Sequence, residues 1–417
     1  MASNTSARAD AAGEPPVDVL VVGAGPGGSA VATHLARLGL DVTVVDRAAF
    51  PRDKACSEYM SPETVRLLDG LGVVAALEAA GAMPLAGTEV TAARGNRLHG
   101  RFALAGAAPF RSTGLSLSRR ILDHVLVGAA RAAGARVLER TTVEALQLED
   151  GAVAGAVVRD AEGRRRTVRA RLTVGADGLR SVVARQLGRR RHGRPRRMAF
   201  VAHVDGVSGM SASAELHVGA RGYVGLNRIG PDRTNVALVV PAERAAEAAG
   251  RTEPFFLEAM ESFPGVAGRL SGGTVSRKVM ATGPFAAWSR RVTADGAALV
   301  GDAADFFDPF TGEGIYSALH GAALLAEAAA EALRGRRGPV PAHRLAGYRQ
   351  ARRRAFAGKW AVERLIGYGM LWPALFDHAV ARLGRRPGMA DTLVGVTGEI
   401  VPARRVLNPL FLARMLV

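Results

Sequence analysis

A glycine-rich turn between an apolar run and a helical pattern constrains the fold of this chain more than any other feature. Residues 17–22 read Val-Asp-Val-Leu-Val-Val, which predicts a buried parallel strand. The turn that follows matches GxGxxG, and apolar residues at helical spacing continue from it until Gly39. A strand, a glycine turn and a helix in this order predict the first unit of a Rossmann-like α/β fold, in which the turn holds the phosphates of a dinucleotide.

Each glycine of the turn has its own role in such a unit. Gly23 permits the tight turn, Gly25 lets the backbone approach a pyrophosphate, and Gly28 lets the helix pack on the strand. Pro26 and Gly27 lie at the start of the helix, where its positive end faces the negative charge. We expect all five residues to contact the cofactor.

A second β-rich run, residues 42–45, ends in an acid. Asp46 lies eighteen residues after Gly28, close to the distance expected for the acid that binds a ribose of the dinucleotide. We expect Arg47, which follows directly, to be a cofactor contact as well. These features complete a dinucleotide-binding unit but do not separate NAD from FAD.

The composition excludes several other kinds of site. Cys56 is the only cysteine, so the chain can form no internal disulfide and no cluster of thiolate ligands, and we expect no metal site. No apolar run approaches the ~20 residues that cross a bilayer, and the first sixteen residues lack the apolar core of a signal peptide. We therefore expect a cytoplasmic protein whose redox chemistry depends on an organic cofactor.

The net charge of +17 raises the question of a nucleic-acid partner. The arginines are spread along the chain, and the one dense run, residues 189–197, contains no aromatic residue that could stack on bases. We interpret this run as a solvated loop; the alternative is a docking site for the phosphates of a nucleotide cosubstrate or for an acidic redox partner. Nucleic-acid binding is kept only as a remote alternative, and we expect no nucleic-acid partner.

Two later segments narrow the choice of dinucleotide. Residues 172–185 read as an apolar strand that ends in Asp-Gly and continues into a helix, and residues 297–316 as a strand, an acid, a loop with Pro and Gly, and a helix. Together with the turn, these segments resemble the flavoprotein family of the aromatic hydroxylases, geranylgeranyl reductases and flavin-dependent halogenases, over about residues 17–335. The resemblance implies that the cofactor is FAD.

The resemblance also implies a role for each matching position. Asp177 and Gly178 would lie beside the pyrophosphate, Gly301 and Asp302 at the ribityl chain, and the loop that starts at Pro309 along the flavin ring. The helix that begins near Glu313 would point its positive end at the negative charge of the reduced flavin. Further cofactor contacts implied in the same way are Cys56, Arg119, Gly312, Gly314 and Ile315.

The motifs do not agree on one branch of this family. Residues 50–58 resemble a segment of the geranylgeranyl reductases that usually ends in Cys-Gly-Glu, with Ser57 here in place of the glycine. The Gly-Glu-Gly of residues 312–314 is also closer to the reductases than to the hydroxylases. In contrast, residues 222–227 lack the Tyr-x-Trp-x-Phe-Pro run of reductases that act on long isoprenoid chains, which predicts a more compact substrate. The Trp-x-Trp-x-Ile-Pro run of tryptophan halogenases is also missing, so we do not expect halogenation.

The expected organisation is a Rossmann-like FAD-binding domain, a β-sheet substrate-binding domain and a C-terminal helical region. The boundaries that we expect are a disordered N-terminus at 1–16, a discontinuous FAD-binding domain at 17–80, 112–185 and 284–335, a substrate-binding sheet at 81–111 and 186–283, and helices at 336–417.

The C-terminal helical region carries aromatic residues at spacings that place several of them on one helix face. We interpret this face as core packing, with a substrate lid or a contact with a membrane surface as the alternative. The residues are Trp360, Tyr368, Trp372 and Phe376.

Two reactions fit these motifs. The sequence favours monooxygenation, with dioxygen as cosubstrate, of an apolar aromatic, polycyclic or prenylated intermediate of secondary metabolism. The alternative is reduction of a carbon-carbon double bond, for which Cys56, Glu58 or Tyr59 could supply the proton. Tyr223 is expected at the substrate pocket, so the candidate catalytic residues are Glu58, Tyr59 and Tyr223.

The electron source must be external to the chain. No second strand-GxGxxG-helix unit occurs between residues 186 and 283, so we expect NADH or NADPH to dock transiently, or a partner flavin reductase to deliver electrons. His203 and His217 lie in the expected substrate sheet, where packing is the favoured interpretation because no motif pairs either with a carboxylate.

Overall fold

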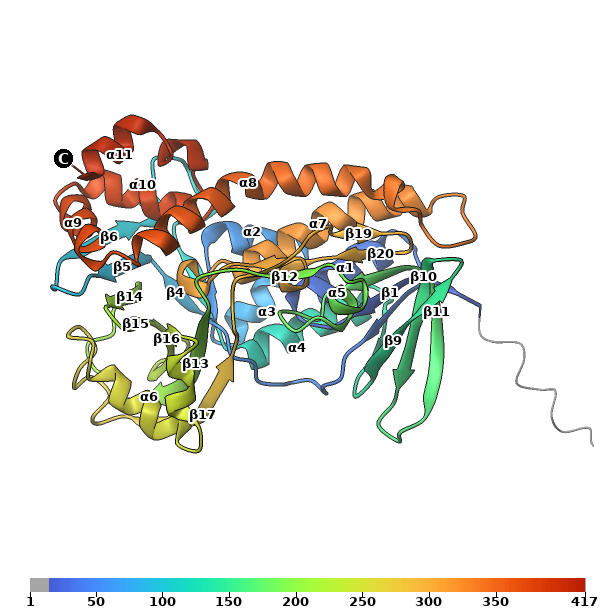
Figure 1. The fold of residues 1–417 in the computed structure, drawn as a ribbon, viewed down its shortest axis with the longest axis horizontal. Coiled ribbons are helices and arrows are strands. Elements are labelled where there is room, and N and C mark those ends of the chain that lie inside the picture. The colour runs from blue at the N-terminus through green and yellow to red at the C-terminus, as the bar shows by residue number, and fades with distance from the viewer. Residues whose placement is uncertain (1–14, 417) are drawn as a thin grey trace, which may run out of the picture.

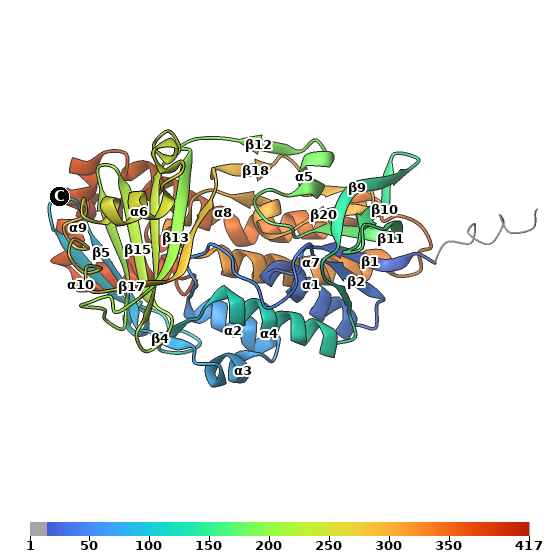
Figure 2. The same ribbon diagram turned by 90° about the horizontal axis from the view of Figure 1, so that it is seen from below.

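The computed structural model describes residues 15–416, and its two large sheets lie side by side beneath long C-terminal helices (Figure 1). The expected disorder of residues 1–16 falls mainly outside the described residues. Figure 2 shows the sheet of β13–β17 on the left and the sheet that contains β1 and β2 on the right, with β12 (Arg190–His192) and β18 (Ala287–Ser289) running between them.

The first sheet has the predicted strand-turn-helix unit at its centre. β1 pairs in parallel with β2 on one side and β11 on the other, and the predicted strands 17–22 and 42–45 coincide with β1 and β2. A β9–β10 hairpin extends from β11 in antiparallel fashion. The strands are β1 (Val17–Val22), β2 (Val42–Val45), β8 (Arg136–Leu138), β9 (Thr142–Glu149), β10 (Ala152–Arg159), β11 (Arg165–Gly175), β19 (Thr293–Ala294) and β20 (Ala297–Leu299).

Helices cover this sheet because its strands are apolar on both faces. One face packs against α1 and its neighbours, where Val19, Val21 and Val44 are fully buried. Small residues bring α1 close to α7: a Cβ at Gly27 would meet the Ala318 side chain at 3.4 Å. The helices are α1 (Pro26–Arg37), α2 (Pro62–Gly70), α3 (Val74–Ala79), α4 (Arg119–Ala132), α5 (Val182–Gln186) and α7 (Gly314–Leu333).

The second sheet has the order β17-β13-β16-β15-β14-β5-β6 and is antiparallel except between β14 and β5. Alternate residues face opposite sides: Val224 and Leu226 pack under α6 (Thr252–Met260), whereas Tyr223 faces the loop before α7. The strands are β5 (Gly87–Thr91), β6 (Arg97–Arg101), β13 (Arg197–Asp205), β14 (Ala214–Gly219), β15 (Gly222–Arg228), β16 (Arg233–Pro241) and β17 (Thr274–Thr282).

Two small sheets join the large ones. Their strands are β3 (Tyr59–Met60), β7 (Gly114–Ser116) and β4 (Met83–Leu85), and β12, β18 and β21 (Asp305–Phe306). Short 3-10 turns complete the connections: η1 (Phe102–Leu104), η2 (Arg244–Ala248), η3 (Gly301–Ala303), η4 (Pro309–Thr311), η5 (Ala342–Leu345) and η6 (Ala403–Arg405). The expected domain boundaries stay a prediction.

The C-terminal region is helical, as the sequence predicts. α8 (Ala346–Gly369) crosses from above the first sheet toward the second, where α9 (Pro373–Gly384), α10 (Pro387–Thr397) and α11 (Pro409–Leu416) cover β5 and β6 (Figure 1). Core packing is wrong for two of its aromatic residues, because Tyr368 and Trp372 are 41% and 60% exposed. No helix or strand among residues 15–416 covers these two side chains. No helix in residues 15–416 is both long and apolar enough to pass through a bilayer.

The contact between α1 and the glycine turn has no room for a side chain. We predict that Gly28→Ala lowers the free energy of unfolding by about 3 kcal/mol or more, because the added Cβ would overlap the Gly23 carbonyl oxygen. Gly321→Ala in α7 is the matched control: its Cβ meets no heavy atom within 4 Å, and helix propensity should leave stability unchanged or up to about 1 kcal/mol higher. Thermal and urea unfolding measure both. Equal stability of the two variants would contradict this packing.

Candidate cofactor and active site

The glycine turn lies directly against the Asp-Gly segment at the end of β11. Gly23 has a φ of +99°, and a Cβ there would lie 2.6 Å from the Ala176 carbonyl oxygen. Two predicted cofactor segments, 150 residues apart in sequence, therefore meet backbone to backbone. Only glycine fits at this contact.

Two arginines face Gly25 from the opposite side. A Cβ at Gly25 would meet only the Nη2 atoms of Arg119 and Arg52, each at 3.8 Å. The buried Asp123 carboxylate holds both guanidinium groups: Arg119 donates to it at 2.7 and 2.8 Å, and Arg52 lies 2.9 Å away. The group keeps an excess positive charge next to the N-terminus of α1, which suits the two charges of a pyrophosphate. Arg119 was predicted, whereas Arg52 and Asp123 were not.

Lys54 and Asp302 place opposite charges in this site. Burial, followed by the charges of Arg119 and Arg52, lowers the pKa of Lys54, and burial raises the pKa of Asp302 against the attraction of Lys54. Within the described residues, no hydrogen bond reaches Lys54 Nζ or the Asp302 carboxylate. Both residues are half-buried, so their charged groups remain available to a polar ligand such as the phosphates and the ribityl hydroxyls of the cofactor.

Asp46 and Asp177 organise backbone at the two ends of the site. Asp46 accepts hydrogen bonds from the amides of Ala24 and Ala48, both at 2.8 Å, which ties β2 to the glycine turn. Asp177 accepts at 2.6 Å from the Ser181 hydroxyl and from the amide of Val182. Burial raises the pKa of Asp177, although these hydrogen bonds oppose the rise.

Arg47 and Gly178, which directly follow the two aspartates, were also predicted to contact the cofactor. Arg47 is exposed beside Asp46. A Cβ at Gly178 would meet Lys54 Nζ at 3.2 Å, so the Asp-Gly segment lies at the same site.

The Arg189–Arg197 run is partly a structural element. Arg190 donates to the carbonyl oxygens of Leu179, Asp302 and Ala303 at 2.7–3.1 Å, and so fastens β12 to two cofactor segments. Arg197 is buried and donates to Asp308 at 2.8 Å. A solvated loop is therefore wrong for these two arginines.

Asp308 connects the loop before α7 to the second sheet. Its carboxylate accepts from Tyr223 Oη at 2.5 Å and from Arg197, so β15 and β13 both hold the loop. Burial raises the pKa of both Tyr223 and Asp308. Pro309 then starts η4, and Gly312 follows its last residue, Thr311.

Gly312 lies against the ring of Tyr59. Its φ is +74°, and a Cβ would lie 2.7 Å from Tyr59 Cδ1. α7 starts at Gly314, next to the predicted Glu313, and Ile315 is buried in the core below. The loop thus runs in the expected order toward a helix N-terminus.

The three candidate catalytic residues are all buried. Glu58 accepts from the Arg119 amide and pairs with His203 Nε2, both at 2.8 Å. Tyr59 packs against Phe102, and burial, followed by the charge of Glu313, raises its pKa well above the usual range. The hydroxyl of Tyr223 is held by Asp308.

His203 and His217 both form hydrogen bonds with carboxylates. His217 pairs with Glu215 at 2.8 Å as His203 does with Glu58, and both histidines are buried. The expectation that neither histidine pairs with a carboxylate is therefore wrong, because the pairing of His203 with Glu58, 145 residues away, had no sequence signal.

Small residues lie on the sheet face below the loop, in the segment that lacks the aromatic run of the long-chain reductases. Gly225 lies between Ala237 and Leu216 in register, and a Cβ at Gly225 would meet only the Glu215 carbonyl oxygen, at 3.9 Å. Phe306 and Phe310 of the loop pack on the same cluster. This face therefore has room for an added side chain at Gly225 and apolar neighbours around it.

Glu313 is a buried acid whose proton is retained at neutral pH. Burial raises its pKa to about 8, with Glu399 and Glu363 acting in the same direction and Lys359 opposing them. Its Oε2 accepts from Ser61 at 3.3 Å and from Thr64 at 3.5 Å, while its buried Oε1 has no partner in the described chain. Lys359 instead donates to Glu363.

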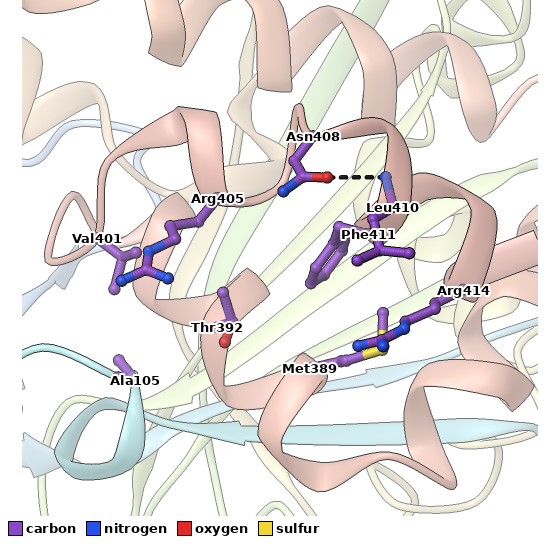
Figure 3. A pocket seen from close by; sticks show the side chains of 10 residues that line it. Ala105, Met389, Thr392, Val401, Arg405, Asn408, Leu410, Phe411 and Arg414 are labelled. Atoms are coloured by element: carbon purple, nitrogen blue, oxygen red, sulfur yellow. Dashed lines mark hydrogen bonds between the residues drawn. The ribbon is translucent and has the colours of Figure 1, made fainter.

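A separate cavity of about 240 Å³ lies among η1, α10, η6 and α11 (Figure 3). Apolar side chains line it together with Arg405 and Arg414, and the Asn408 side chain accepts from the Leu410 amide at 2.7 Å. It shares no residue with the cofactor site.

The fold and the site define an FAD-dependent oxidoreductase. Residues 16–363 match the family described as FAD binding domain, and the chain belongs to this family. The α/β fold, FAD as the cofactor and the predicted resemblance are thereby confirmed, with NAD(P)H or a partner reductase as the electron source that suits the family.

Relatives within the family carry two kinds of activity in their names. Digeranylgeranylglycerophospholipid reductase 1 of Methanococcoides burtonii is 30% identical over 76% of this chain and 75% of its own length. Menaquinone reductase of Mycolicibacterium smegmatis is 31% identical over 74% and 75%. The structure of PqsL, a probable FAD-dependent monooxygenase from Pseudomonas aeruginosa, is 25% identical over 86% and 98%, with a TM-score of 0.69.

We predict that Gly25→Val and Asp302→Ala each reduce flavin binding without unfolding the protein. The valine side chain would fill the space between the turn and the two guanidinium groups, and the alanine would remove a charged hydrogen-bond acceptor, so FAD affinity should fall about ten-fold or more in each case. The ratio of flavin to protein absorbance in the purified variants measures this, with Gly321→Ala as the control. Full flavin content in both variants would disprove this placement of the site.

We also predict a pH dependence of stability that originates at Glu313. The folded chain keeps this proton up to about pH 8, whereas the unfolded chain loses it near the usual 4.5. The stability that Glu313 contributes is therefore complete below the lower value and is lost as the pH rises through the higher one.

Glu313→Gln removes this titration while keeping the shape of the side chain. The melting temperature of the wild type should fall relative to that of the variant between about pH 5 and about pH 9. Glu327→Gln, on the exposed side of the same helix, controls for the loss of a carboxylate. A constant difference between wild type and Glu313→Gln across this range would refute the prediction.

Proposed function

We propose that this chain is a flavin-dependent reductase that saturates a carbon-carbon double bond of a compact apolar compound, such as a prenylated or quinone-type molecule. Sequence analysis favoured monooxygenation. Two named reductases at 30% and 31% identity, each matched over three quarters of its length, now favour reduction. The reductase-like segment at residues 50–58 points the same way.

The observation that carries the proposal is the position of Cys56. Its Sγ accepts a hydrogen bond from the Glu58 amide at 3.4 Å, and against the effect of burial the side chains of Asp123 and Cys56 both raise the pKa of Arg119. Arg119 also faces Gly25, so the thiol belongs to the cofactor site. Cys56 remains partly accessible, unlike Glu58, Tyr59 and Tyr223.

These contacts suit Cys56 for the proton transfer of a reduction. FAD, once bound and reduced by NAD(P)H or a partner reductase, would supply a hydride to one carbon of the double bond. The Cys56 thiol gives its proton to the other carbon, and the Arg119 guanidinium stabilises the thiolate that remains. Solvent returns the proton, NAD(P)H or a partner reductase restores the flavin, and the product carries two more hydrogens than the substrate.

The predicted catalytic residues receive positioning roles in this proposal. Glu58 joins the amide of Arg119 to His203 and thereby fixes the segment that carries Cys56. Tyr223 holds the loop before α7 through Asp308, and Tyr59 supports Gly312 from behind. Substrate size follows from Gly225 and Ala237, whose small side chains leave space for a ring or a short prenyl chain and offer no aromatic surface to a long one.

Monooxygenation is the second candidate, since the probable monooxygenase PqsL matches 86% of this chain. The apolar cluster of Phe285, Phe306 and Phe310 near the loop would exclude water, which oxygen transfer requires. The two reactions differ in mass and in their need for air.

An anaerobic assay separates the two reactions. We predict that the dithionite-reduced enzyme, mixed with a short-chain prenylated quinone or alcohol without air, yields a product two hydrogens heavier. Cys56→Ala should lower this rate about 10²-fold or more while FAD content and the rate of flavin reduction by NAD(P)H stay unchanged. Products that gain oxygen, and form only after air is admitted, would replace this proposal with monooxygenation.

A further inference from the structure

Five consecutive apolar residues lie exposed where α8 turns into α9. They are Leu371, Trp372, Pro373, Ala374 and Leu375, and the Trp372 side chain is 60% exposed. Single apolar residues are common on protein surfaces, but a continuous exposed run usually marks a contact with another molecule. We call this segment, together with Leu365, Tyr368 and Trp288, the apolar corner.

The apolar corner continues onto two neighbouring elements. Leu365 and Tyr368, on the last turns of α8, are 39% and 41% exposed. Tyr368 Oη donates to the Arg194 carbonyl oxygen at 3.2 Å, which places the segment after β12 beside the helix. Gly193 in that segment faces Trp288 of β18, since a Cβ at Gly193 would lie 2.6 Å from the indole ring. Two tryptophans and a tyrosine thus lie on connected surface.

Positive charge surrounds this corner, and negative charge is missing from it. Arg191, Arg194, Arg196 and Arg364 are exposed, and none forms an ion pair with any residue from 15 to 416. The stretches 187–199 and 364–376, which form the corner, contain no aspartate or glutamate. Unpaired arginines next to exposed tryptophan and tyrosine match a membrane-water interface, where rings enter the headgroup layer and arginines bind lipid phosphates.

The inner side of the same corner reaches the active site. Met370 and Phe376, at the two ends of the exposed run, point inward and belong to the buried cluster that contains Phe310 of the loop before α7 and Tyr223 of the sheet. A single turn of chain therefore separates the exposed apolar surface from the apolar walls of the proposed substrate site. In Figure 1 this turn lies between the ends of α8 and α9, at the left of the molecule.

We propose that the apolar corner docks the protein on an anionic lipid membrane and that apolar substrates enter from the bilayer past the α8–α9 turn. The entry route rests on the proposed function, whereas the docking does not. The chain's net charge of +17 favours the same partner, because an anionic surface attracts the whole molecule before the corner inserts. A second copy of the chain is a poorer fit, since it would bring the same unpaired arginines together.

The docking can be tested without any substrate. The flavin-loaded protein is sedimented with vesicles of phosphatidylcholine alone and of phosphatidylcholine mixed with phosphatidylglycerol. We predict binding about ten-fold or more tighter to the mixed vesicles, with the difference lost at high salt. Leu371→Ser/Trp372→Ser should weaken it about ten-fold or more by removing buried apolar surface, and Arg194→Ala/Arg196→Ala should weaken it only on anionic vesicles.

Leu148→Ser is the matched control, because Leu148 is 59% exposed on β9 of the first sheet. It should bind vesicles like the wild type, and all variants should keep their flavin absorbance and melting temperature. The proposal would be overturned if the wild type did not bind anionic vesicles. It would also be overturned if Leu371→Ser/Trp372→Ser kept its vesicle binding and instead turned a dimeric protein into a monomer. A failed reductase assay with intact vesicle binding would reject only the proposed reaction.

Discussion

One buried carboxylate, Asp308, holds the cofactor half and the substrate half of this molecule in a common arrangement. It belongs to the loop that leads into α7, and its two partners, Tyr223 and Arg197, come from two strands of the other sheet. Removing Arg197 would leave the buried carboxylate without its ion-pair partner, which costs far more than a surface ion pair contributes, and removing Tyr223 would cost it a hydrogen bond. The position of the loop over Gly225, the packing of Phe310, and hence the shape of the proposed substrate site all depend on this contact.

The local parts of this fold could be predicted because their causes are local. The strand at 17–22, the glycine turn, the strand at 42–45 and the helix start at Glu313 each follow from a periodicity or a glycine requirement within a few residues. The contacts that finish the site join residues far apart in sequence. Asp123 pairs with Arg119 one turn earlier in α4, but its contact with Arg52 spans 71 residues and the contact of Glu58 with His203 spans 145.

The C-terminal aromatics illustrate a different limit. Spacing on one helix face shows that Tyr368 and Trp372 belong to an apolar surface, but it does not show what covers that surface. Here the chain turns away after α8 and leaves the surface open, while Met370 and Phe376 between and after them face inward. A pattern that normally forms a core can equally form an interface, and only the position of the following helix distinguishes the two.

Lys54 and Asp302 give the cofactor a structural role in addition to its chemical one. Both residues are half-buried, and no hydrogen bond within the described residues reaches the ammonium group or the carboxylate, so a bound cofactor would supply partners for both. Since FAD binds only the folded chain, folding and cofactor loading form one linked equilibrium, in which free FAD shifts the population toward the folded state. The amount of this protein that a cell maintains would then follow its flavin supply, because chains that fold before FAD is available remain the least stable and the most exposed to proteolysis.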